Sequence, residues 1–202
     1  MAQQRRNQTR RRPRYEFKPD DLGAGFFSRL HLTKLQQRQL LRWTLFGLIC
    51  VLGSVLQDVI MSRVSILGAT TDLVPCAILL ITVAIGSEQG SYFVLIASAL
   101  YYFTGSAPGP FAIAFLSFLG LGGALFRESF WRRGFASDVL CAAVAMLGYE
   151  LATFGAGIFI GVTTWHRFGV FLLTAIFSIA VMIPLYSAVS AIDKIGGETW
   201  KE

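Results

Sequence analysis

The chain has 202 residues, of which 54% are hydrophobic and 15% are charged. Soluble domains average roughly a quarter charged residues, so this composition argues against a soluble fold and indicates one membrane-embedded domain. The net charge of +6 would suggest a nucleic-acid partner, but it is local: residues 1–42 carry a net charge of +8, and the remaining 160 residues carry −2. We therefore expect no nucleic-acid partner.

Residues 1–42 are predicted to form a basic cytoplasmic tail with two parts. Residues 5–18 are polar and basic and contain Pro13, which predicts disorder. Residues 30–42 combine leucines with Lys and Arg. This pattern indicates either an amphipathic helix lying on the membrane surface or a retention charge that only sets topology. Because clustered basic side chains are attracted to anionic lipid, such lipid is the expected partner of the tail.

Six membrane-spanning helices are predicted in residues 43–190, followed by a short cytoplasmic C-terminus at residues 191–202. The first span covers residues 43–60, and Gln57 and Asp58 near its end are expected to meet the far surface of the membrane. The predicted fold class is thus an all-α integral membrane protein built as a six-helix bundle.

The second and third spans are predicted as a tight hairpin within Thr71–Pro110. A single helix over Leu73–Ala107 would be about 52 Å long, which is too long for a hydrocarbon core roughly 30 Å thick. The turn is expected at Gly86–Gly90, which contains two glycines, a serine, an amide and the charged Glu88. Each arm is short, so burial among neighbouring helices or local bilayer thinning is expected.

The fourth, fifth and sixth spans are predicted at residues 111–126, 137–160 and 168–189. At the start of the fifth span, Ser137 is expected at the N-cap and Asp138 in the first turn. These two residue types satisfy free backbone N–H groups and complement the positive end of a helix.

Loop charges agree with the six-span count. With the N-terminus inside, 16 Lys and Arg residues lie on the cytoplasmic side and two, Arg63 and Arg167, lie outside. Arg127, which follows the fourth span, is counted among the cytoplasmic loop charges. Both termini are therefore predicted to be cytoplasmic.

No enzymatic chemistry is predicted, and no cofactor or metal is expected. The chain has two histidines, His31 and His166, which fall in no metalloprotease motif, and no glycine-rich phosphate loop precedes a lysine. Cys50, Cys76 and Cys141 lie inside apolar segments without a CxxC spacing, so they are predicted to be small buried hydrophobic residues.

Glu150 is the outstanding polar residue, because it falls near the middle of the fifth span. A charged side chain there costs about 2.5–3.5 kcal/mol on insertion scales, so it needs a partner. Glu150 is predicted either to hydrogen-bond inside the bundle, with Gln57 or a hydroxyl group, or to form a proton, cation or partner-protein contact. Asp58, Asp72 and Asp138 fall at helix ends, where solvated capping is expected.

Small residues at the end of the fourth span and the start of the fifth predict a contact with a partner helix. Glycine and alanine let the backbones of two membrane helices approach closely. Gly120 and Ala142 are the candidate residues of this contact.

Two segments, LQDVIMSRVSILGATTDLVPCAILL and GSEQGSYFVLIASALYYFTGSAPGP, show a resemblance to a known family. The order of their features resembles the rod shape-determining protein MreD. Here a first span ends near Gln57, Leu67-Gly68 forms an outer turn, Asp72-Leu73 enters the second span, and glycines punctuate the third. The resemblance covers about residues 45–150.

The resemblance implies a non-enzymatic component of the bacterial cell-elongation machinery, located in the cytoplasmic (inner) membrane. Such a protein would be a scaffold that links cell shape to peptidoglycan synthesis through helix–helix contacts. Its partner would be an MreC-like bitopic protein, and through it the actin-like cytoskeleton and the peptidoglycan synthases.

The same resemblance implies a fold similar to the substrate-binding subunits of energy-coupling-factor vitamin transporters. A subunit for small-molecule uptake is therefore the alternative function. Those subunits commonly carry an Ala-x-x-x-Ala contact on the first span, whereas residues 43–60 contain no alanine. This difference favours the scaffold.

Overall fold

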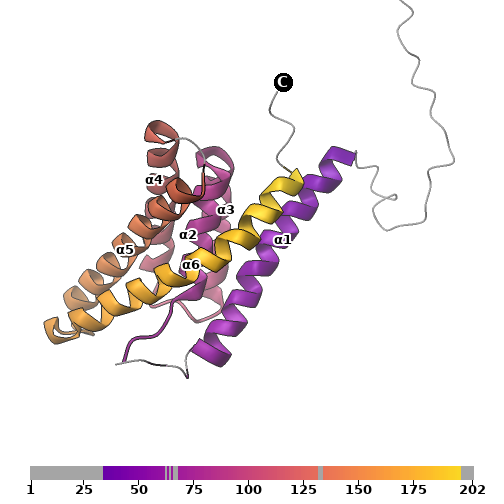
Figure 1. Cartoon of the computed structure of the whole chain (residues 1–202). Helices are drawn as coiled ribbons and strands as arrows, with labels where there is room; N and C mark the ends of the chain where they lie inside the picture. Colours follow the sequence, from indigo (N-terminus) through magenta and orange to yellow (C-terminus); the bar gives the residue numbers. More distant parts are fainter. Residues whose placement is uncertain (1–33, 62, 64, 66–67, 132–133, 197–202) are drawn as a thin grey trace, which may run out of the picture. The chain divides into compact units, whose positions relative to one another are not determined.

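A computed structural model describes residues 34–61, 63, 65, 68–131 and 134–196 (Figure 1). The predictions for residues 1–33 of the basic tail and for residues 197–202 of the C-terminus fall outside this part of the chain. The chain divides into two units, Met1–Gln37 and Arg38–Glu202. Of the first unit, the structure describes Lys34–Gln37 alone, as the first turn of a helix.

The described residues form helices and connecting loops, without β-strands. In chain order the elements are α1 (Lys34–Leu56), the π-helical turn η3 (Gln57–Met61), α2 (Leu73–Ile85), α3 (Ser87–Phe103), α4 (Phe111–Phe130), α5 (Phe135–Ile160), the 3-10 turn η4 (Trp165–Arg167) and α6 (Phe168–Gly196).

Four of the described helical segments are long and apolar enough to cross a membrane, namely Gln36–Ile60, Phe111–Phe130, Phe135–Ile160 and Trp165–Ile195. Helix α2 is also apolar but has 13 residues, which makes it about 20 Å long. The prediction of an all-helical fold is thus confirmed for the described residues, and these four segments are compatible with a multi-pass membrane protein. The six-span count is not confirmed.

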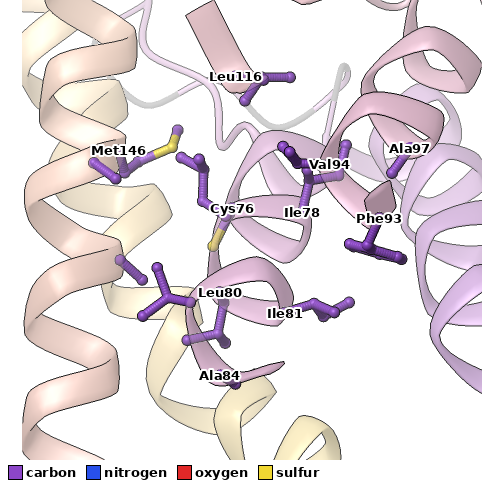
Figure 2. Packing of buried hydrophobic residues seen from close by; sticks show 14 of the residues in the cluster. Cys76, Ile78, Leu80, Ile81, Ala84, Phe93, Val94, Ala97, Leu116 and Met146 are labelled. Carbon is purple, nitrogen blue, oxygen red and sulfur yellow. The ribbon is translucent and has the colours of Figure 1, made fainter. Parts of the chain in front are cut away.

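Helix α2 lies at the centre of the second unit and is buried along its whole length. It contacts α3, α4, α5 and α6 (Figure 1). Its residues are apolar on every side, as expected for a helix surrounded by others rather than one with a single buried stripe. Figure 2 shows part of this core: Cys76, Ile78, Leu80, Ile81 and Ala84 of α2 with Phe93, Val94, Ala97, Leu116 and Met146.

The turn between α2 and α3 is tighter than predicted. Gly86 alone separates the two helices, with φ of 106°, a conformation that side chains with a Cβ rarely adopt. The remaining residues of the predicted turn, through Gly90, form the first turn of α3 instead. At Gly90 the helix backbones come so close that a Cβ would stand 2.7 Å from the carbonyl oxygen of Thr82.

The predicted helix starts need two corrections. Helix α1 begins at Lys34, so the described residues of the predicted surface helix belong to the same continuous helix as the first span. Helix α5 begins at Phe135 after Gly134, and Ser137 donates its hydroxyl to the Gly134 carbonyl at 2.8 Å rather than capping a free N–H group. In both cases regular helix extends beyond the expected boundary.

Candidate functional site

The ends of α2 are buried among other helices, so their free backbone groups need partners from those helices. At the N-terminal end, the side-chain oxygen of Gln57 accepts a hydrogen bond from the Val74 N–H at 2.9 Å. The N–H of Asp72 donates to the Ser178 hydroxyl of α6 at 2.9 Å. Gln57 therefore caps α2.

At the C-terminal end of α2, Arg127 of α4 supplies the capping group. Its Nη1 donates to the Ala84 carbonyl and to the Asp138 carboxylate, both at 3.1 Å. A cation at this position complements the negative end of the helix dipole. The neighbouring Glu128 accepts a hydrogen bond from the Ser87 N–H at 2.9 Å and so caps the start of α3.

Arg127 and Asp138 form a buried ion pair, with side chains 0% and 8% exposed. The Tyr186 hydroxyl of α6 donates to the second carboxylate oxygen of Asp138 at 3.3 Å. Two sequence-based predictions are therefore wrong: Arg127 is not a loop charge, and Asp138 is not a solvated cap. Both predictions assumed that a charge at the end of an apolar run lies at the surface. Here α2 is short, so the groups that meet its C-terminal end lie inside the bundle.

A second polar cluster lies at the other end of α2. Glu150 is 4% exposed, and its Oε1 is buried without a hydrogen-bond partner among the described residues. Asp72 precedes α2 but makes no side-chain cap to it, so its predicted capping role is wrong as well. The third predicted cap, Asp58, accepts hydrogen bonds from the exposed Ser106 hydroxyl at 2.9 and 3.1 Å.

Gly120 and Ala142 are both buried inside the bundle. A Cβ on Gly120 would lie 3.1 Å from Val94 and 3.4 Å from Leu79, so this glycine lets α4 approach α2 and α3. Ala142 is 0% exposed within the core around α2. Both residues thus pack inside the bundle in the isolated chain, and their contact with a partner helix stays a prediction.

A groove of about 480 Å³ separates α1 from α3. Among the described residues, the extensive contacts between helices are all within α2–α6 and η4, and α1 is attached by individual side chains, among them the fully buried Phe46. Near its start, Arg42 donates to Gln89 at 2.9 Å, and Trp43 packs against Phe93 with 6.1 Å between ring centroids. After its end, Gln57 and Asp58 make the contacts described above. The middle of α1 leaves the groove open.

Small and apolar residues form most of the groove. On α1 it is lined by Gly47, Cys50, Val51, Ser54 and Val55, and on α3 by Phe93, Ile96, Ala97, Leu100, Tyr101 and Phe103. Val74 of α2 also lines the groove, and Trp43, Asp58 and Thr104 lie at its ends. Nothing in the sequence places the small residues of α1 beside Ala97 of α3.

No family model, curated protein sequence or solved structure matches the chain. Its class therefore follows from fold and composition. The described residues form an all-helical bundle with four helices able to cross a membrane, which is compatible with a multi-pass membrane protein. The groove between α1 and α3 is its candidate binding surface.

Proposed function

We propose that this protein is a non-enzymatic membrane scaffold that holds the membrane-spanning helix of a partner protein in the groove between α1 and α3. The groove carries the proposal, because its volume and its length along two helices suit a row of side chains from a third helix. Gly47, Ser54 and Ala97 provide the small residues that let a third helix approach closely.

The polar groups of the groove favour a helix over a small-molecule substrate. Ser54 donates its hydroxyl to the Cys50 carbonyl at 3.0 Å, and Thr104 donates to the Tyr101 carbonyl at 2.7 Å. Asp58 is engaged by Ser106. A substrate site needs polar groups that fix the orientation of its ligand, and here those groups already have partners within the chain.

The partner, the location and the cellular process in this proposal rest on the resemblance to MreD. The partner is an MreC-like bitopic protein, and the scaffold belongs to the elongation machinery of a bacterial inner membrane, connected to peptidoglycan synthases and the actin-like cytoskeleton. The basic tail contributes by binding anionic lipid. In this arrangement α2 and α3 are two short additional crossings, which gives six crossings with both termini in the cytoplasm.

Topology can be tested with single cysteines at two exposed positions, Pro108 and Lys194, in a background without the native cysteines. We expect an impermeant thiol reagent to label Pro108→Cys in intact cells, and to label Lys194→Cys after the cells are opened. The reverse pattern would refute the six-crossing arrangement.

Occupation of the groove can be tested by filling it. A Cβ on Gly47 meets no atom within 4 Å, so Gly47→Phe projects a ring into the groove without disturbing the bundle. We expect recovery of a co-expressed MreC-like partner from mild detergent to fall about tenfold, which corresponds to about 1.4 kcal/mol. Depletion of the protein should produce rounded cells.

Gly155→Phe is the matched control, because a Cβ on Gly155 also meets no atom within 4 Å but this residue lies on α5, outside the groove. It should leave partner recovery unchanged. Equal recovery with both variants would exclude the groove as the binding surface. If the purified protein retained a stoichiometric vitamin-like molecule, this result would refute the scaffold function and favour the small-molecule uptake function.

A further inference from the structure

Two polar side chains in the middle of α5 are buried without hydrogen-bond partners. Glu150 is 4% exposed and Thr153 is 8% exposed. Within the described part of the chain, neither Glu150 Oε1 nor the Thr153 hydroxyl oxygen has a partner. Buried polar atoms in folded proteins are nearly always paired, because burial removes their hydrogen bonds to bulk water. These two oxygens therefore indicate a bound ligand.

The spacing of Glu150 and Thr153 makes them neighbours on the helix surface. They are three positions apart in α5, and such residues have about 5–6 Å between their Cβ atoms. Tyr149 also has a buried hydroxyl oxygen without a described partner, but adjacent residues such as Tyr149 and Glu150 do not face each other. Two neighbouring oxygens that are not hydrogen-bonded to each other can be joined by one small molecule.

A small hollow lies beside Glu150, between α5 and α6, which pack against each other (Figure 1). Its volume is about 10 Å³, the lower bound of the space that one water molecule needs. Apart from Glu150, the described residues that line it are apolar: Leu147, Leu151, Phe168, Phe171, Leu172 and Ala175. The hollow therefore admits a ligand the size of one water molecule, and Glu150 is the polar group that holds it.

Water fits this site better than a metal cation does. A buried water molecule needs two to four polar partners, and Glu150 and Thr153 supply two. The water can donate to the Glu150 oxygen and accept from the Thr153 hydroxyl group at the same time. A cation such as Ca²⁺ or Mg²⁺ takes about six oxygen ligands or more, which the apolar lining of the hollow does not offer.

We propose that one water molecule is bound at Glu150, in the hollow between α5 and α6, and links Glu150 Oε1 to the Thr153 hydroxyl group. The water supplies the hydrogen bonds that the apolar face of α6 does not offer to Glu150. It thereby couples two side chains that have no direct hydrogen bond to each other. The hollow and the groove between α1 and α3 have different lining residues, so this site does not depend on the proposed scaffold function.

A double-mutant cycle on the full-length protein in detergent tests this coupling. Thr153→Val removes the hydroxyl group and keeps the shape of the side chain. We expect it to lower the unfolding temperature by about 2–4 °C, the shift that the loss of one typical hydrogen bond causes in a chain of this length. In the Glu150→Met background the same substitution should have little effect, because the water has already lost its other partner. Equal effects in the two backgrounds would overturn the proposal.

Thr82→Val is the matched control. Thr82 is also buried, but its hydroxyl group donates to the Ile78 carbonyl of α2, so its substitution should have the same effect with and without Glu150→Met.

If Glu150→Met does not fold, a high-resolution experimental density map of the wild-type protein provides the test. We expect a water peak about 2.5–3.0 Å from both Glu150 Oε1 and the Thr153 hydroxyl oxygen. A map without this peak, or with the two oxygens in direct contact, would overturn the proposal. Stabilisation of the wild-type protein by Na⁺ but not by K⁺, lost in Glu150→Gln, would overturn it in favour of a cation.

Discussion

Replacing Arg127 by Leu is expected to destabilise the protein by about 3–5 kcal/mol, the typical cost of removing one partner of a buried ion pair. The substitution leaves the Asp138 carboxylate, with its side chain 8% exposed, without its positive partner. It also removes the donor to the Ala84 carbonyl at the end of α2. Reversible unfolding in detergent, followed as the free energy of unfolding, measures this loss.

The double variant Arg127→Leu/Asp138→Leu distinguishes the contribution of the ion pair to the free energy of unfolding from the cost of burying one of its charges alone. Because it leaves no unpaired buried charge, its free energy of unfolding should exceed that of Arg127→Leu alone. If the two single substitutions and the double one gave additive losses, the pair would not be coupled as its 3.1 Å contact indicates.

The second large effect is expected at Gly90. Gly90→Ala places a Cβ 2.7 Å from the Thr82 carbonyl oxygen, so α3 must move away from α2. Overpacking of this kind costs typically about 1–3 kcal/mol. The backbone atom that it meets cannot rotate away as a side chain could.

Gly122→Ala is the matched control, because a Cβ at Gly122 of α4 meets no atom within 4 Å. There the same chemical change should be neutral or should stabilise the helix by up to about 0.5–1 kcal/mol, since alanine loses less conformational freedom than glycine. Equal unfolding free energies for the two variants would show that α2 and α3 are not in such close contact.

The helical bundle was largely predictable from the sequence, because apolar runs longer than a few turns identify membrane helices with little ambiguity. The hairpin position was also predictable, since Gly86 interrupts the apolar stretch after α2. Its tightness was not, because the composition of Gly86–Gly90 does not distinguish a turn from a glycine placed for close packing.

The polar sites were predicted only in part. Glu150 stands out in the sequence because it interrupts an apolar helix, but the linear pattern does not show that one of its carboxyl oxygens is buried without a hydrogen-bond partner among the described residues. Arg127 and Asp138 were assigned to the surface because each lies at the end of an apolar run. Their burial depends on the short length and central position of α2, which only the assembled bundle defines.

The groove was not predictable, because it depends on the distance between two helices rather than on the composition of either. The first span contains small residues at Gly47 and Ser54, as do many membrane helices that pack tightly. Here side chains such as Arg42 and Phe46 attach α1 to the bundle, and these small residues line a groove instead.

The complete enclosure of α2 has a consequence for how the protein is made. Membrane helices enter the bilayer first and associate afterwards. In the six-crossing arrangement proposed above, α2 is surrounded by lipid until the helices encoded after it arrive. It tolerates that interval because its residues are apolar on every side and the Thr82 hydroxyl bonds to the Ile78 carbonyl of the same helix. In that arrangement protein replaces lipid around α2 during assembly. The enclosure needs α6, which follows α2–α5 in the chain and brings Ser178 to Asp72.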